Sequence, residues 1–212
     1  MSKSVQAPAA TWKETRRRAA QAAIVEAAWQ LAREDGLPGL SMRELARRAG
    51  VTTPTLYAYF DSKYDIYDAM FGDAAADFAG HMSAPFTFDS KHPAEHLAEG
   101  LRRFVEFCTT DVPRYQLLFQ RIIPGFEPSA DSYAYAVEAL EGTRRRLAAI
   151  GVTRPEQIDI WTALVTGLVD QQISNEPGGD RWIRLSGEVV EMFLSYCMKS
   201  SPQNRSRKGA GK

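Results

Sequence analysis

The chain has 212 residues, of which 44% are hydrophobic and 10% aromatic, so it can bury a sizeable core as one domain or two small ones. Its 26 Lys and Arg balance 26 Asp and Glu, which by itself argues against a nucleic-acid ligand. No apolar run approaches the roughly 18 residues of a membrane span, and the N-terminus lacks the apolar core of a secretory signal. We therefore expect a cytoplasmic protein with no membrane partner.

The balanced total hides an uneven distribution of charge. Residues 1–63 carry ten Lys and Arg against six Asp and Glu, residues 64–198 carry eleven against twenty, and residues 199–212 carry five against none. A basic N-terminal module on an acidic body is typical of a protein that meets phosphate with one end only. We expect residues 1–12 and the basic tail 200–212 to be disordered, because both are polar and lack a core pattern.

The first predicted helix runs from Lys13 to Glu34, where apolar residues recur at helical spacing, and Gly36 closes it. Three consecutive arginines, 16–18, stand near its start. They form either a solvated face or contacts to the DNA backbone or the adjacent minor groove, since cations at a helix N-terminus oppose its dipole.

Residues 40–63 predict two short helices joined by a tight turn. Ser41 and Glu44 have the S-x-x-E spacing of a capping box, and Leu40 and Leu45 have the spacing of a hydrophobic staple. Gly50 ends this helix, because glycine enters the left-handed backbone region without steric cost.

The second short helix starts at Thr52 or Thr53, either of which can cap it, with Pro54 in its first turn. Leu56 and Phe60 point inward, which leaves hydroxyl-bearing side chains outside. This arrangement has the form of a helix-turn-helix whose second helix reads DNA. An ordinary helical hairpin has the same local signals.

Residues 18–66 resemble the N-terminal DNA-binding domain of the TetR family of transcriptional regulators. The matching residues stand at unbroken spacing: Ala46, Gly50, Val51, Thr55, Leu56, Tyr57, Tyr59, Phe60 and Lys63. The departures are Leu45, Pro54, Tyr64 and Asp65. The resemblance implies that Tyr59 and Lys63 contact phosphates.

We expect the outward side chains to divide the DNA surface between them. The candidates for base edges are Arg43, Thr53, Thr55 and Tyr57, and those for phosphates are Ser41, Thr52, Tyr59 and Lys63, with Pro54 on the same surface.

The rest of the chain predicts further helices and no strand. Asp61 or Ser62 caps a helix that runs to about Gly80 and links the two parts, and residues 81–92 form a loop. Further helices are predicted at 93–110, 112–122, 129–150, 155–174 and about 180–199. The fold class is therefore all-α with about nine helices: a three-helix helix-turn-helix domain (13–62), then a helical bundle for ligand binding and dimerisation (63–199).

Aromatic residues are more numerous in the second part than a small bundle needs, although such stripes are more often plain core. We expect a small-molecule pocket there, as the resemblance also implies, for a mostly apolar or aromatic ligand. Its candidate lining residues are Phe104, Phe107, Tyr115, Phe119, Phe126, Tyr133 and Trp161. In the helix 129–150, an inward face is predicted from Tyr133, Val137, Leu140 and Leu147.

The last two helices carry apolar residues on more than one face, and Gly167 and Gly187 would permit a close approach. We expect a homodimer with a four-helix interface, which would place two reading heads about one DNA turn apart, ~34 Å. This part also resembles one branch of the family. The matches are Pro113, Tyr115, Leu117, Leu118, Phe119, Trp161 and Gly167, while Thr166 replaces the usual histidine.

Other chemistry is not indicated. Cys108 and Cys197 lie far apart within apolar patterns, which favours buried thiols over a disulfide, with a redox sensor as the minor alternative. His92 and His96 are four apart, but a pair of ligands is an incomplete metal site. With no phosphate loop or nucleophile motif, we expect no enzyme activity and no cofactor or metal.

The sequence hypothesis is a ligand-responsive dimeric transcriptional regulator, most simply a repressor, that binds a near-palindromic operator and is released by its effector. The alternatives are an all-helical small-molecule-binding enzyme and a non-specific DNA-binding protein.

Overall fold

The computed structural model describes residues 11–84 and 92–199, and every regular element within these ranges is a helix. The predicted all-α class is confirmed. The elements are α1 (Trp12–Asp35), α2 (Met42–Arg48), α3 (Thr53–Tyr57), α4 (Lys63–Ser83), α5 (Pro93–Thr110), α6 (Val112–Phe119), α7 (Ala130–Ala149), α8 (Pro155–Asn175), the short 3₁₀ helix η1 (Ile183–Leu185) and α9 (Ser186–Lys199).

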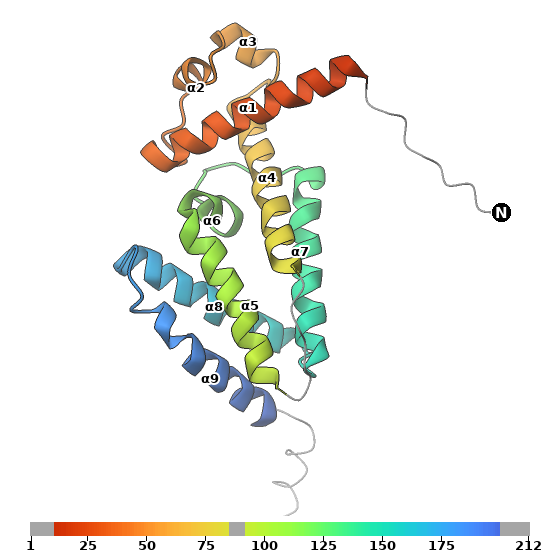
Figure 1. Ribbon diagram of the computed structural model, residues 1–212, viewed down its shortest axis with the longest axis vertical. Coiled ribbons are helices and arrows are strands. Elements are labelled where there is room, and N and C mark those ends of the chain that lie inside the picture. The colour runs from red at the N-terminus through yellow and green to blue at the C-terminus, as the bar shows by residue number, and fades with distance from the viewer. Residues whose placement is uncertain (1–10, 85–91, 200–212) are drawn as a thin grey trace, which may run out of the picture.

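The helices form a head and a body joined by α4. Figure 1 shows α1, α2 and α3 gathered at one end of the molecule, while α4 runs from this end into the body beside α7. In this view α7 lies to the right of α4, and the remaining helices, α5, α6, α8 and α9, lie to the left of α4 or below it.

Two apolar clusters lie along α4. Ile66, Met70 and Phe71, from its first half, are buried with residues of α1 to α3, whereas Phe78 and Met82, from its second half, are buried with residues of α5, α8 and α9. Helix α4 is therefore part of both cores: its apolar residues pack in the head over its first half and in the body over its second half.

Local signals in the sequence set several helix ends. Thr11 and Glu14 form a capping box at the start of α1, and Gly36 ends that helix with φ +77°. Ser62 caps α4, where its hydroxyl accepts from the Asp65 N–H and the Asp65 carboxylate accepts from the Ser62 N–H at 2.9 Å.

α4 and α7 are tied together at the start of α7. The Asp68 carboxylate of α4 accepts hydrogen bonds from the Ser129 N–H at 2.6 Å and from the Ser129 and Ser132 hydroxyls, both at 2.9 Å. An anion at a helix N-terminus is also favoured by the helix dipole. Gly72 lies at this contact, where a Cβ would stand 3.1 Å from the Ser132 hydroxyl oxygen.

Several predicted boundaries were wrong. Helix α1 begins at Trp12, inside the segment expected to be disordered, because Thr11 caps it. Helix α4 continues to Ser83, α6 ends at Phe119 rather than residue 122 because Gln120 takes an extended backbone, and α9 begins only at Ser186.

The other expectations for the segments 1–10, 85–91 and 200–212 lie outside the described residues. Within the described helices, none combines the length and the apolar character that crossing a bilayer requires.

The predicted inward face of α7 was also wrong over most of its length. Leu147 is buried, but Tyr133, Val137 and Leu140 are 51%, 45% and 42% exposed. Helix α7 buries Ala139 instead, since α4 packs against its smaller residues.

Candidate functional site

The first candidate site is the outer surface of α2 and α3. Helix α2 begins at Met42, directly after Ser41, as predicted, and Leu40 and Leu45 are both buried. The predicted capping box is wrong, because Ser41 makes no side-chain cap and Glu44 instead pairs with Arg47. The Ser41 hydroxyl is therefore not used to hold the helix.

The turn and α3 follow the sequence closely. Gly50 has φ +68°, and Thr52 caps α3, its hydroxyl accepting from the Thr55 N–H at 3.3 Å. Leu56 and Phe60 are buried, so α3 is fixed to the head by its inner face. Its outer face is free to meet a groove.

The nine candidate DNA contacts lie on or beside this face. Six are exposed: Ser41, Arg43, Thr52, Pro54, Thr55 and Tyr57. Thr53, Tyr59 and Lys63 are partly buried. The hydroxyls of Thr52 and Thr55 lie 2.8 Å apart and share a hydrogen bond, so they would meet DNA as one unit.

Two of the expected phosphate contacts have partners within the protein. The Lys63 ammonium donates to the Pro38 carbonyl at 3.3 Å and lies 5.3 Å from the centre of the Tyr67 ring, and burial lowers its pKa. The Arg17 guanidinium lies over the Tyr59 ring at 5.6 Å. The arginine run 16–18 thus provides one cation beside Tyr59.

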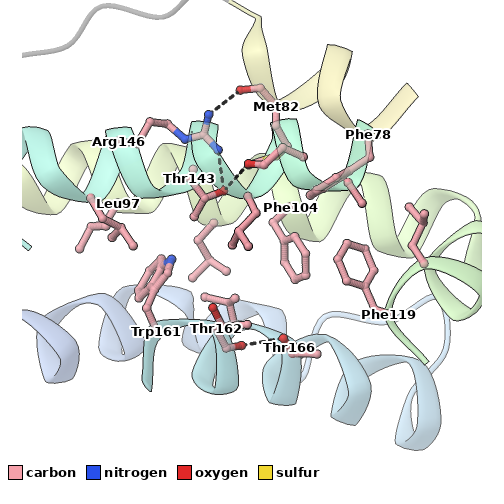
Figure 2. A pocket seen from close by; sticks show the side chains of 18 of the residues that line it. Phe78, Met82, Leu97, Phe104, Phe119, Thr143, Arg146, Trp161, Thr162 and Thr166 are labelled. Carbon is pink, nitrogen blue, oxygen red and sulfur yellow. Dashed lines mark hydrogen bonds between the residues drawn. The ribbon is translucent and has the colours of Figure 1, made fainter. Parts of the chain in front are cut away.

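The second candidate site is a cavity of about 170 Å³ in the body, between α4, α5, α6, α7 and α8 (Figure 2). Most of its lining is apolar: Ala75, Phe78, Met82, Leu97, Leu101, Phe104, Leu118, Phe119, Ala136, Ala139, Leu140, Leu147, Trp161 and Val165. The polar lining residues are His96, Thr143, Arg146, Thr162 and Thr166. Such a mixture of apolar walls and a few polar groups is typical of small-molecule sites.

The polar residues lie on opposite walls of the cavity. Figure 2 shows Thr143 and Arg146 on α7 and Trp161, Thr162 and Thr166 on α8. The Arg146 guanidinium donates to the Met82 carbonyl at 3.1 Å and to the Thr143 hydroxyl at 3.0 Å. Burial lowers the pKa of Arg146, and the nearby cations Arg103 and Arg145 act in the same direction.

Residues 24–70, which span the helix-turn-helix, match the family described as bacterial regulatory proteins, tetR family. The chain belongs to the TetR family of transcriptional regulators.

Two relatives of this TetR-family chain extend the similarity into the body. The HTH-type transcriptional repressor BepR of Brucella suis biovar 1 (strain 1330) is 26% identical, covering 82% of this chain and 90% of the relative. The tetracycline repressor protein class C of Escherichia coli is 25% identical, covering 84% and 78%. A tetR-family transcriptional regulator from Streptomyces coelicolor has the same fold, with a TM-score of 0.70, 18% identity, and 91% and 86% of the two chains covered.

Three of the seven aromatic residues predicted to line a pocket in this TetR-family protein do line the cavity: Phe104, Phe119 and Trp161. The other four do not. Phe107 packs against Phe78, Tyr115 is fully buried and donates to Asp170 at 2.6 Å, Phe126 contacts Tyr67 and Phe71, and Tyr133 is stacked on Phe71 at the surface.

The α4 wall of the cavity and its polar lining residues were not predicted from the sequence. Phe78 and Met82 on α4 could have been found from their helical spacing on the linking helix. Arg146 could not, because it stands in a run of three arginines and no local signal distinguishes the one that turns inward.

Other sequence expectations concerned cysteines and histidines. Cys108 is fully buried, and burial raises the pKa of its thiol, while Cys197 is partly buried. Within residues 11–84 and 92–199, no three His, Cys, Asp or Glu side chains are grouped to hold a metal ion.

Proposed function

We propose that this TetR-family regulator is a homodimeric repressor that binds a near-palindromic operator and is released by a small apolar or aromatic effector. The names of its two relatives, both repressors, support the sign of regulation. As in the sequence hypothesis, we place the protein in the cytoplasm and assign it no catalytic activity. We also keep the division into a DNA-binding domain (13–62) and a ligand-binding and dimerisation domain (63–199).

The observation that carries the proposal is the double role of α4. Its first half is buried in the head with Ile66 and Met70, and its second half provides Ala75, Phe78 and Met82 to the cavity wall. A ligand that moves Phe78 or Met82 would therefore move α4, the helix to which the head is fixed. Any such ligand must bind more tightly to the conformation that does not bind DNA. The coupling free energy between ligand and DNA is roughly 1–3 kcal/mol in typical cases.

On the DNA side, we assign base contacts to Arg43, Thr53, Thr55 and Tyr57. The exposure of Arg43, Thr55 and Tyr57 supports this role, while Thr53 is partly buried, and Tyr57 is 46% exposed although it is a large aromatic residue. Ser41, Thr52, Tyr59 and Lys63 then position the head on phosphates, with Pro54 at the same surface.

The proposed dimer uses α8 and α9. Ile160, Leu185 and Met192 are exposed on or beside these helices, Met192 by 63%. Added Cβ atoms at Gly167 and Gly187 would meet nothing within 4 Å, so both positions leave room for a partner helix. Exposed apolar residues on two adjacent helices favour a self-complementary interface, which a two-fold axis requires.

The test is to select bound genomic fragments with the full-length protein, footprint them, and titrate one bound fragment. We expect protection of two half-sites about 10 base pairs apart, centre to centre, or a multiple of one turn. Small molecules extracted from the purified protein should weaken that binding when added back. Equal affinity for random duplex would favour the non-specific alternative, and an extract without effect on DNA affinity would count against release by a ligand.

A further inference from the structure

The cavity has the size of a single aromatic ring with a substituent. Its volume of about 170 Å³ is close to that of an engineered cavity of ~150 Å³ that binds benzene. Phe104, Leu101 and Trp161 are among the apolar groups that enclose it. Size and apolar lining alone would suit a neutral ring.

The charges on the wall do not suit a neutral ring. Two lining residues, His96 and Arg146, have basic side chains, and no Asp or Glu is among the described lining residues. Burial lowers the pKa of His96, which favours its neutral form. Arg146 is thus the cation of this wall.

Arg146 differs from other arginines in the body and head that are at least partly buried. Arg48, Arg103 and Arg114 each have a carboxylate oxygen within 3 Å, on Glu34, Glu99 and Asp73 respectively. Arg146 donates to a carbonyl and a hydroxyl, and no ion pair of the described residues includes it. A guanidinium has five N–H donors, so several remain for a ligand in the planar arrangement that a carboxylate matches.

The remaining polar groups offer acceptors. The hydroxyls of Thr143, Thr162 and Thr166 each donate to the carbonyl four residues earlier, at 3.1, 2.9 and 2.6 Å. Thr162 and Thr166, on the wall opposite Arg146, therefore present lone pairs to the cavity. A ring hydroxyl or amine on a ligand could donate to them.

We propose that the cavity binds a small aromatic carboxylic acid, with its carboxylate on the Arg146 guanidinium and its ring between Phe104 and Trp161. This inference rests on the proposed ligand-responsive function and names the chemical class of its ligand. The carboxylate supplies the counter-charge that the wall lacks, and a donor on the far side of the ring meets Thr162 or Thr166.

A wider groove on the outside of the cavity supports an anionic end at this position. It shares Met82, His96 and Arg146 with the cavity and adds Arg145 and Glu138. Arg146 thus stands between an apolar interior and a polar opening, which is where the charged end of an amphiphilic acid would lie. Glu138 is the acidic group of this groove and is not among the charges that act on Arg146.

Calorimetric titration of the full-length protein without DNA tests the assignment. The probes are benzoate, 4-hydroxybenzoate and benzamide, the neutral match of benzoate. We expect both acids to bind at least about 10-fold more tightly than benzamide, which is the ratio of affinities that one charge-assisted hydrogen bond supplies. Arg146→Gln should remove this preference, and Arg146→Lys should retain part of it. Arg144→Gln is the matched control and should leave it intact, because Arg144 is exposed, pairs with Glu141 and lines neither the cavity nor the groove.

Equal binding of benzoate and benzamide, acid binding unaffected by Arg146→Gln, or no binding of either acid up to about 10 mM each overturns the proposal. If Arg146→Gln does not fold, the comparison of acid with amide on the unmodified protein and on Arg146→Lys still decides. A separate DNA titration distinguishes the two levels. Arg146-dependent binding of an acid that leaves operator affinity unchanged contradicts the effector function alone, whereas release by neutral extracts without acid binding contradicts only the anion site.

Discussion

The indole N–H of Trp29 in α1 donates to a carboxylate oxygen of Asp73 in α4 at 2.9 Å. The same carboxylate pairs with Arg114 of α6 at 2.9 Å, and the Arg114 guanidinium lies 4.7 Å from the centre of the Trp29 ring. Three helices therefore meet at one contact: α1 of the head, the linking helix α4, and α6 of the body. A shift of α4 would have to carry this contact with it or break it.

Trp29→Phe should destabilise the protein by roughly 2–3 kcal/mol, because it removes a hydrogen bond to a charged group and leaves part of a fully buried side chain's volume empty. Urea unfolding measures this change. Trp12→Phe is the control, since Trp12 is 76% exposed, and should change the free energy of unfolding by less than about 0.5 kcal/mol. Equal effects of the two variants would contradict a special role for the contact.

Tyr67→Phe tests the fixing of α4 to the head. The buried Tyr67 hydroxyl donates to the Leu37 carbonyl at 2.6 Å, so its loss should cost about 1–1.5 kcal/mol. Tyr64→Phe is the matched control, because its hydroxyl donates to the Pro124 carbonyl from an exposed position and should contribute less.

The same tyrosine predicts a pH dependence. Burial raises the pKa of Tyr67 from 10.0 to about 12, so between these values the folded state keeps a proton that the unfolded state has lost. The free energy of unfolding should therefore be highest below pH 10 and fall as pH rises to about 12. The fall should be shallower in Tyr67→Phe, and identical pH profiles in the two proteins would exclude Tyr67 as its source.

Gly50→Ala should destabilise the head by about 1 kcal/mol or more, because Gly50 has φ +68° and alanine is strained there even though no atom lies within 4 Å of the added Cβ. Gly80→Ala provides the opposite case: Gly80 lies within α4 with open space around it, so alanine should stabilise by about 0.5–1 kcal/mol. Melting temperatures that move in the same direction for both variants would contradict this account.

Local chemistry could be predicted from the sequence and competition between partners could not. Gly36, Gly50 and Thr52 have the roles their residue types favour, because a positive φ or a free N–H is a property of the backbone nearby. The capping box predicted at Ser41 does not form, because the Glu44 carboxylate pairs with Arg47, three residues further along the same helix.

Which residues line the cavity could not be predicted from the sequence, because it depends on how the helices pack against one another. Periodicity placed Tyr133, Val137 and Leu140 on one face of α7, but which face α4 would cover was decided by the close approach at Gly72 and by the hydrogen bonds of Asp68. Burying small residues there left Tyr133 and Val137 at the surface, whereas Leu140 lines the cavity. An aromatic residue in the sequence is thus a good guide to core and a poor guide to cavity walls.

Thr55→Ala should change the operator sequence that is preferred while leaving the fold intact. Thr55 is exposed, and its hydroxyl bonds to that of Thr52, so the alanine variant alters what α3 presents to base edges. Selection of bound fragments by the variant and by the unmodified protein measures the change. Thr55→Ser keeps the hydroxyl and loses only the methyl group. If Thr55→Ser changes the preferred sequence as much as Thr55→Ala does, the methyl group, and not the hydroxyl, is what reads the base.

Lys63→Ala should weaken binding to all duplex sequences alike and reduce the salt slope by about one unit, because a lysine on a phosphate releases about one counter-ion. In the free protein the Lys63 ammonium already donates to the Pro38 carbonyl, and two of its three N–H donors remain for a phosphate. Lys199→Ala, at the end of α9, is the control for the loss of a positive charge far from the head. An unchanged salt slope in Lys63→Ala, together with a lower melting temperature, would mean that Lys63 stays on the loop between α1 and α2 and serves the fold rather than the DNA.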